Sequence, residues 1–422
     1  MSLQPSRPGR SRPPGGTRRI VDRFEGRLLH AFSSPLMVLV VVAAMLAVTG
    51  AFASYGLRAP LRTDYLAMIT GARILGAGGC LYCHAAQVHA QAVLLGQKGA
   101  AFDAFLETPL VALAYRPLAG LPPSAGFAVF LALSAGCVVA AGVLLWRRLG
   151  LAIHGPAGLA LLALTLISLP AAWNYHLGQV DGLLVLPLVA GAVLLGAGRP
   201  FAAGLLLSLP LLKPQTAWLV PLALLAAGEW RAVLGMVVGV ACWAGASLCL
   251  VGPGGIGQWL SLLGEQGPAV ATSIGIPGAF AGLGGNGLGF TVAAALAAIA
   301  CAWLLWRRRS LMGRPLHMLA LGIAASLLLA PHVYAYDLIA VTVPLAVLGR
   351  RTPAAALAAA VLLNAAYVVD TFFIVSGPHL EALALLLVVA LLVVEPGERS
   401  AATLPRPGAS QAPVAISTTT GA

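Results

Sequence analysis

The sequence predicts an all-α protein, a polytopic membrane helical bundle of about 12 transmembrane helices, with extra helices in its extracytoplasmic loops. Of its 422 residues, 59% are hydrophobic and only 9% are charged, and the mean hydropathy is +0.92. A soluble domain carries about 25% charged residues. Apolar runs near the roughly 20 residues that cross a bilayer recur along the chain. A water-soluble surface is therefore excluded.

Arginines give the topology. The formal charge of +12 would suit nucleic acid if it formed one basic face, but the arginines instead form short clusters between apolar runs. By the positive-inside rule these clusters belong to the cytoplasmic side. They are Arg18–Arg27, Arg147–Arg148, Arg199, Arg231, Arg307–Arg309 and Arg350–Arg351.

Placing the clusters inside defines the membrane spans. Ten of them are expected near residues 35–56, 124–146, 155–172, 178–197, 231–251, 288–306, 315–331, 334–349, 353–374 and 380–395. Residues 201–228 must begin and end in the cytoplasm, so they form a hairpin of two short helices with its tip at Lys213-Pro214-Gln215. Residues 105–120 form a re-entrant or interfacial helix.

Three units follow from this layout. Residues 1–34 are a disordered basic cytoplasmic tail, residues 35–395 the transmembrane domain and residues 396–422 a second disordered cytoplasmic tail. The long segments 57–104 and 252–287 face outward. Unusual polar residues gather at that outer face, and ionisable groups near a membrane mark a functional site by default. They are Asp64, His84, His176, Gln179, Asp181, Lys213, Gln215, His332 and Asp337.

Asp64 directly follows the first span, within Arg62-Thr63-Asp64-Tyr65. A partly buried carboxylate has a raised pKa and can act as a general base. The alternative is a helix cap or a loop carboxylate paired with Arg62 or Arg73.

Two further polar turns join outer ends of spans. Asn174, His176, Gln179 and Asp181 lie within one turn region, where they can hold sugar hydroxyls or cap a helix. Tyr334 and Asp337 follow His332 in a similar turn. A lone histidine at a turn is more often solvated, but these neighbours favour a shared site.

Lys213 lies in an otherwise apolar stretch. A buried ammonium needs an anion, and the nearby sequence supplies no acidic residue, so the partner is a distant carboxylate or a ligand phosphate. The alternative is that Lys213 extends to the surface.

Cys80-x-x-Cys83-His84 has the spacing of c-type haem attachment. A haem also needs a packed apolar pocket, and no cytochrome-like domain surrounds the motif. A chance match or a loop disulfide is favoured because the outer side is oxidising.

In order, these motifs resemble glycosyltransferase family 87, membrane enzymes of the GT-C class that include polyprenol-phosphate-mannose-dependent α-1,2-mannosyltransferases. The resemblance runs from Asp64-Tyr65 through Gly-x-x-x-Tyr82, Asn174-x-x-x-Gly-Gln-x-Asp181 and Ala203-Gly204 to Lys213-Pro214, and ends at Pro-His332-x-Tyr-x-Tyr-Asp337. The chain departs from the family pattern at Asp181, where the family usually has Asn, and at Glu107-Thr108-Pro109.

The resemblance implies an inverting transfer of a sugar, with mannose expected, from a polyprenyl-phosphate donor to a lipid or glycan hydroxyl. Asp64 occupies the family's catalytic position. Lys213, His332 and Arg62 are expected at the donor phosphate, because a phosphate leaving group needs cations and not a general acid. Substrate contacts are expected from Asn174, His176, Gln179, Asp181, Tyr334, Asp337, Tyr65 and Tyr82.

The expected setting is a bacterial plasma membrane with an extracytoplasmic site, and the arginine placement with twelve spans leaves both termini cytoplasmic. No cofactor and no metal are expected, because no Asp/Glu/His cluster with ligand spacing appears. A secondary transporter or lipid-sugar flippase is the main alternative, although the two halves lack matching polar features. A haem-bearing membrane protein is the second.

Overall fold

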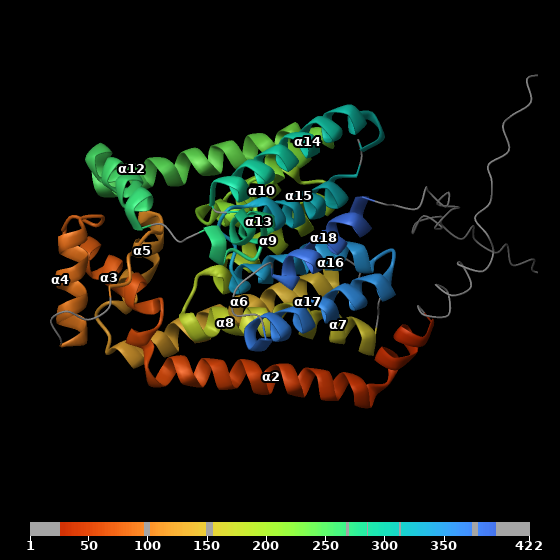
Figure 1. The fold of residues 1–422 in the computed structure, drawn as a ribbon, viewed down its shortest axis with the longest axis horizontal. Helices are drawn as coiled ribbons and strands as arrows, with labels where there is room; N and C mark the ends of the chain where they lie inside the picture. Colours follow the sequence, from red (N-terminus) through yellow and green to blue (C-terminus); the bar gives the residue numbers. More distant parts are fainter. Residues whose placement is uncertain are drawn as a thin grey trace, which may run out of the picture.

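The computed structural model describes residues 26–96, 102–148, 155–266, 270–284, 286–311, 314–373 and 379–393, and in these ranges all regular structure is helical. The all-α prediction is confirmed. Most long helices run along one common direction, with α2 at one edge of the view and α12 and α14 at the other (Figure 1). The helices of the bundle are α2 Pro35–Arg58, α6 Pro123–Arg148, α7 Pro156–Leu166, α8 Leu169–Leu177, α9 Asp181–Gly196, α12 Trp230–Gln266, α14 Asn286–Leu311, α15 Pro315–Leu329, α16 Thr342–Gly349, α17 Pro353–Phe373 and α18 Leu380–Val393.

Proline marks the beginning of several of these helices. α2, α7 and α15 each begin with a proline, whose fixed φ suits the first turn and whose missing N–H is not needed there. At the start of α2, Ser34 adds a cap by accepting a hydrogen bond from the N–H of Met37.

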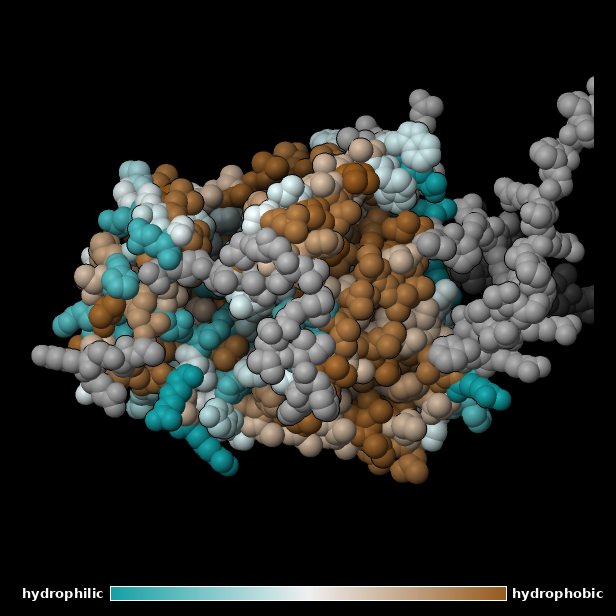
Figure 2. Space-filling model, viewed as in Figure 1, coloured by the Kyte–Doolittle hydropathy of each residue, from teal (hydrophilic) through white to brown (hydrophobic). Residues whose placement is uncertain are grey.

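Five helices in the described ranges are long and apolar enough to cross a membrane: α2, α6, α12, α14 and α17. A sixth span arises if α7 and α8, bent by 43°, are taken together. Figure 2 shows a broad hydrophobic surface across the middle of the molecule, with hydrophilic residues gathered toward the two ends. This is the surface of a membrane protein.

The count of twelve crossings is not confirmed by helix length. The other predicted spans coincide with shorter apolar helices of 10–17 residues. α15, for example, has 15 residues and is therefore about 22 Å long, less than the roughly 30 Å of hydrocarbon. Two of them end at motifs that suggested a site: Pro200–Leu212 stops before Lys213-Pro214, and α15 stops before Pro331-His332.

The predicted hairpin is confirmed. It consists of α10 Pro200–Leu207, the 3₁₀ turns η3 Leu209–Leu212 and η4 Pro214–Thr216, and α11 Val220–Ala226. Gly204 of α10 packs against the backbone of Ala232, and Ser208 lies against Gly239, so α10 runs parallel to α12. Because α11 ends just before α12 begins, the chain has turned back at Lys213.

A second hydrophobic core lies at one end of the bundle, separate from the main one. There α3 Tyr65–Gly76, α4 His84–Leu95 and α5 Pro109–Tyr115 gather beside the last part of α12 (Figure 1). Between α2 and α3 lies the 3₁₀ turn η1 Pro60–Arg62, and η2 Arg116–Leu118 follows α5. α12 reaches this end because it continues past a kink at Gly252, where the sequence predicted the span to stop. We call this end the outer lobe.

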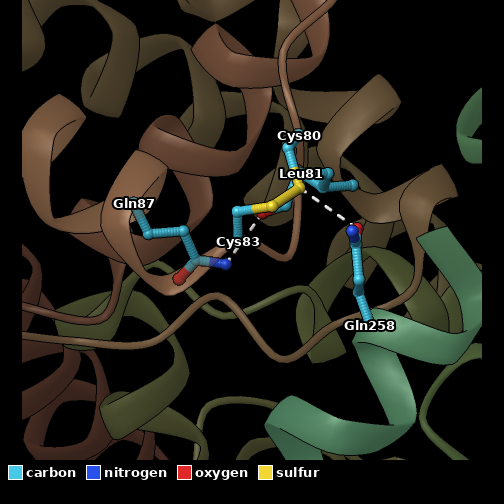
Figure 3. The surroundings of a disulfide bond; sticks show 5 residues. All are labelled: Cys80, Leu81, Cys83, Gln87 and Gln258. Atoms are coloured by element: carbon cyan, nitrogen blue, oxygen red, sulfur yellow. Dashed lines mark hydrogen bonds between the residues drawn. A yellow bond between two sulfur atoms is a disulfide. The ribbon is translucent and has the colours of Figure 1, made fainter. Parts of the chain in front are cut away.

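Cys80 and Cys83 form a disulfide in the outer lobe (Figure 3). Two sulfurs bonded to each other cannot form the thioether bonds that a c-type haem requires. Gln87 holds the same turn by donating to the carbonyl of Leu81 at 2.9 Å, and Cys80 Sγ lies 3.1 Å from Gln258 Oε1 of α12. The disulfide therefore closes a tight turn within the outer lobe, and this turn contacts α12 at Gln258.

The two predicted tails lie almost entirely outside the described residues. The described chain begins at Gly26 with a short helix over residues 26–33 and ends at Val393 in α18. Both of these ends lie at the side of the molecule opposite the outer lobe (Figure 1).

Candidate functional site

Asp64 sits at the junction between α2 and the outer lobe. After α2 ends, η1 and Thr63 redirect the chain into α3, with Thr63 Oγ1 donating to Pro60 O at 2.7 Å and accepting from the N–H of Tyr65 at 3.3 Å. Asp64 occupies the N-cap position of α3 but makes no capping hydrogen bond. Its half-buried carboxylate is therefore free for another use, and the capping alternative does not apply.

Asp64 lines a pocket of about 1080 Å³ between the end of α2, the start of α6 and the outer lobe. The charged residues of this pocket are Arg58, Arg62, Asp64 and Asp103. Burial raises the pKa of Asp64 above its usual value, an effect that the Gln179 hydrogen bond and the Lys213 charge reduce but do not cancel. Burial, and then the Asp64 charge, raise the pKa of Asp103 to about 7.

Gln179 links Asp64 to the helix bundle. Gly178 follows the last residue of α8, and its φ of +74° is the left-handed conformation that glycine adopts readily. Gln179 follows directly, and its Nε2 donates to Asp64 Oδ2 at 2.5 Å. Tyr115, the last residue of α5, also holds this turn, because its hydroxyl donates to the carbonyl of Gly178 at 2.6 Å.

Lys213 lies behind Gln179, at the tip of the hairpin. Its Nζ is 2.7 Å from Asp181 Oδ2, 3.1 Å from Asp337 Oδ1 and 3.4 Å from Gln179 Oε1. The ring of Tyr336 covers the same ammonium, with its centroid at 4.4 Å. Lys213 is only 2% exposed. Of the two partners that the sequence allowed, the structure supplies the distant carboxylates.

Together these residues form one continuous polar line. It begins at Asp64 in the pocket, passes through Gln179 and ends at Lys213 with its two aspartates inside the bundle. The members come from four breaks in the helices: the α2–α3 junction, the α8–α9 turn, which supplies both Gln179 and Asp181, the hairpin tip, and the 3₁₀ helix η6 Ala335–Val341 that carries Asp337. The ion pairs are buried, so they fix the relative positions of these breaks.

Two predicted substrate contacts prove to be aromatic core residues. Tyr65 is fully buried against Phe127 and Tyr115. Tyr82 is also buried, and its hydroxyl donates to the carbonyl of Glu107 at 2.7 Å. Adjacent helix positions point about 100° apart, so Asp64 can face the pocket while Tyr65 faces the core.

Asn174 is also turned inward. Its Oδ1 accepts from the N–H of Gly182 at 3.1 Å and its Nδ2 donates to Ser134 Oγ at 3.4 Å. Of the two expectations for this turn, capping therefore holds for Asn174, which is fully buried. His176 lies on the outer side of α8 in an aromatic group with Phe52 and Tyr55. None of these groups lines the Asp64 pocket.

The remaining predicted residues are spread around the polar line. The backbone N–H of Tyr334 donates to Asp337 Oδ2 at 2.8 Å, and the Tyr334 hydroxyl lies 3.4 Å from Thr272 Oγ1. His332 lines a separate apolar groove of about 480 Å³ with Trp218 of the hairpin. Arg62, in contrast, lies in the Asp64 pocket as expected for a phosphate contact.

Sequence reasoning missed Arg58 and Asp103. Arg58 closes α2 and could have been noticed as an arginine outside the clusters that the positive-inside rule assigned to the cytoplasm. Asp103 lies in an extended segment held by Gln91, whose Oε1 accepts from the N–H of Asp103 at 3.1 Å and whose Nε2 donates to its carbonyl. Only the fold brings that segment to Asp64.

The fold and this site define a class: a polytopic helical membrane protein with a charged pocket at one end of its bundle, backed by a buried ionic network. Residues 105–331 match the model of glycosyltransferase family 87. Because the match spans more than half of the chain, the protein belongs to glycosyltransferase family 87 and is a membrane glycosyltransferase. No curated protein and no solved structure matches the chain.

The matched range contains Asn174, Gln179, Asp181 and Lys213 but neither Asp64 nor Asp337. Family membership decides against the transporter as the primary function. It does not assign a role to Asp64, which rests on the geometry of the pocket.

Proposed function

We propose that the protein transfers a sugar, mannose in the first instance, from a polyprenyl-phosphate donor to a hydroxyl group of a lipid or glycan acceptor. The observation that carries this proposal is the Asp64 pocket, which combines one carboxylate suited to be a base with two arginines suited to a phosphate. The pocket lies at the end of α2, next to the apolar surface of the bundle. A prenyl chain can therefore remain in the bilayer while the phosphate of the donor reaches the two arginines. The GT-C arrangement of about twelve crossings belongs to the same proposal.

In the proposed reaction, Asp64 removes the proton from the acceptor hydroxyl while the oxygen of that hydroxyl attacks the anomeric carbon of the donor sugar. The bond between that carbon and the phosphate oxygen breaks, and the phosphate leaves with the electron pair. A phosphate monoester is a weak base, so it leaves without a proton. A single displacement inverts the anomeric configuration.

Arg58 and Arg62 would hold the donor phosphate and stabilise the charge that develops on it. Lys213 acts in this proposal through Gln179, because its Nζ is enclosed by Asp181 and Asp337 and is nearly inaccessible. This replaces the direct phosphate contact expected from the sequence. The extracytoplasmic location of the pocket, in a bacterial plasma membrane, remains part of the proposal.

The donor class can be tested with purified protein in proteoliposomes. Polyprenyl-phosphate mannose, glucose and arabinose, each radiolabelled, would be offered beside GDP-mannose with a membrane lipid extract as acceptor. We expect label transfer from a polyprenyl-phosphate sugar and none from the nucleotide sugar. Transfer from GDP-mannose alone would refute the proposed donor class.

A further inference from the structure

A second polar cluster lies at the turn between α17 and α18, apart from the Asp64 pocket. It consists of Asp370 near the end of α17 and His379 and Glu381 at the start of α18. Each offers one ligand atom, a carboxylate oxygen or a ring nitrogen, and these atoms all lie within 4.8 Å of one another. A tetrahedral cation with bonds of about 2.0–2.2 Å holds its ligand atoms about 3.3–3.6 Å apart, so the three side chains would have to draw closer together when the ion binds.

Helix capping accounts for only part of this cluster. Asp370 Oδ2 accepts from the N–H groups of Leu380 and Glu381 at 2.6 and 3.3 Å, which ties α18 to α17. The other carboxylate oxygen, Asp370 Oδ1, is buried and has no hydrogen-bond partner in the described part of the chain. Glu381 Oε2 is equally buried and unpartnered among the described residues.

The charges of the cluster do not balance. Asp370 is 6% exposed and Glu381 is 2% exposed, so both carboxylates are removed from water. The neighbouring base is His379, whose Nδ1 lies 3.9 Å from Asp370 Oδ2. Even a protonated histidine leaves one negative charge uncompensated, and buried charges are costly unless paired or bound to a metal.

We propose that Asp370, His379 and Glu381 bind one divalent transition-metal cation, of the Zn²⁺ or Mn²⁺ type. An imidazole with two carboxylates suits these ions, whereas Ca²⁺ and Mg²⁺ prefer oxygen ligands alone. The cation satisfies the two unpartnered oxygens and joins α18 to α17. It lies outside the Asp64 pocket and takes no part in the sugar transfer, so this inference does not depend on the proposed function.

The test uses the full-length protein in detergent, purified with a tag that contains no histidine and stripped with a chelator. The protein is incubated with equimolar Zn²⁺ or Mn²⁺, desalted, and its metal content measured by mass spectrometry. We compare the wild type with Glu381→Gln and His379→Ala. His89→Ala is the matched control, because His89 is exposed on α4 in the outer lobe.

We expect close to one metal per chain in the wild type and in His89→Ala. Glu381→Gln should lose the metal, and His379→Ala should bind it on the order of tenfold or more weakly. The metal should also raise the thermal unfolding midpoint of the wild type but not of Glu381→Gln. If Glu381→Gln does not fold, His379→Ala, which changes a partly exposed side chain, decides alone.

Two results would overturn the assignment. One is a wild type that retains no metal after desalting, which would mean that the carboxylates share a proton instead. The other is equal metal content in the wild type and both cluster variants, which would place the metal elsewhere.

Discussion

Asp64 owes its proposed role to neighbours that act on its pKa in opposite directions. Burial raises the pKa, while the hydrogen bond from Gln179 and the charge of Lys213 lower it. A raised pKa makes a carboxylate a stronger base, and the two opposing contributions keep its anionic form from being disfavoured by burial alone. Burial, and then the charge of Asp64, raise the pKa of the nearby Asp103 carboxyl to about 7.

Gln179→Ala removes the donor that stabilises the Asp64 anion. We expect the rate of transfer to fall about 10- to 100-fold, which corresponds to the roughly 1.5–3 kcal/mol of a hydrogen bond to a charged group. The acid limb of the pH–rate profile should move to higher pH, because losing that donor raises the pKa of Asp64. An unchanged acid limb would show that Gln179 does not act on Asp64.

Asp103 gives the pocket an upper pH limit. Its pKa of about 7 means that it gains a negative charge near neutrality, in a pocket that would receive a donor phosphate. We therefore expect the KM for the donor to rise above about pH 7 in the wild type and to stay level in Asp103→Asn. The measurement is the donor KM across pH 6–9, and identical profiles would contradict this role.

At the scale of elements, the site is made where helices break. α7 and α8 meet at a bend, α8 and α9 at Gly178, and α10 and α11 at the Lys213 tip. Gln179 and Lys213 both lie at such breaks, and the breaks bring their side chains into contact inside the bundle. The breaks that position the polar line also divide the apolar segments into short helices, which lowers the number of candidate spans.

Gly178→Ala tests the α8–α9 turn. An added Cβ would meet the Phe127 ring at 2.8 Å in addition to the strain of a φ of +74°. Gly198 is the matched control, since its φ is +73° but an added Cβ meets nothing within 4 Å. We expect Gly198→Ala to lower stability by about 1–2 kcal/mol through strain alone.

Gly178→Ala should lower the thermal unfolding midpoint further than Gly198→Ala and should also reduce transfer, because Gln179 shifts away from Asp64. Thermal unfolding in detergent and the transfer rate measure the two effects. Equal behaviour of the two variants would mean that the packing against Phe127 does not position the turn.

At the scale of the whole molecule, the bundle provides the frame and the outer lobe completes the pocket. The main core holds the transmembrane helices, and the smaller aromatic core holds α3, α4 and α5 at one end. The Trp259 indole of α12 donates to Leu106 O at 2.7 Å and so connects this lobe to α12. The segment that carries Asp103 is positioned by these contacts.

Much of this frame was accessible from the sequence. Hydropathy and arginine placement predicted the all-helical membrane architecture and the turn at Lys213, because membrane insertion follows those two properties directly. The motif order predicted the family. Asp64, Gln179 and Lys213 were singled out because isolated polar residues are conspicuous in an apolar chain.

Other features depended on contacts between distant segments. The roles of Tyr65, Tyr82 and Asn174 follow from which way each side chain points, and a motif does not encode direction. Lys213 looked like a phosphate ligand because its carboxylate partners, Asp181 and Asp337, are far along the chain. Asp103 joins the pocket through the fold of the outer lobe alone.

The central claim is that Asp64 removes the acceptor proton. The most direct measurement compares single-turnover transfer by the wild type, Asp64→Asn and the control Glu229→Gln, whose side chain lies at the α11–α12 turn. With all three at equal levels in proteoliposomes, we predict a loss of about 10²- to 10⁴-fold in Asp64→Asn and an unchanged rate in Glu229→Gln. A folded Asp64→Asn protein that transfers sugar at the wild-type rate would contradict the account.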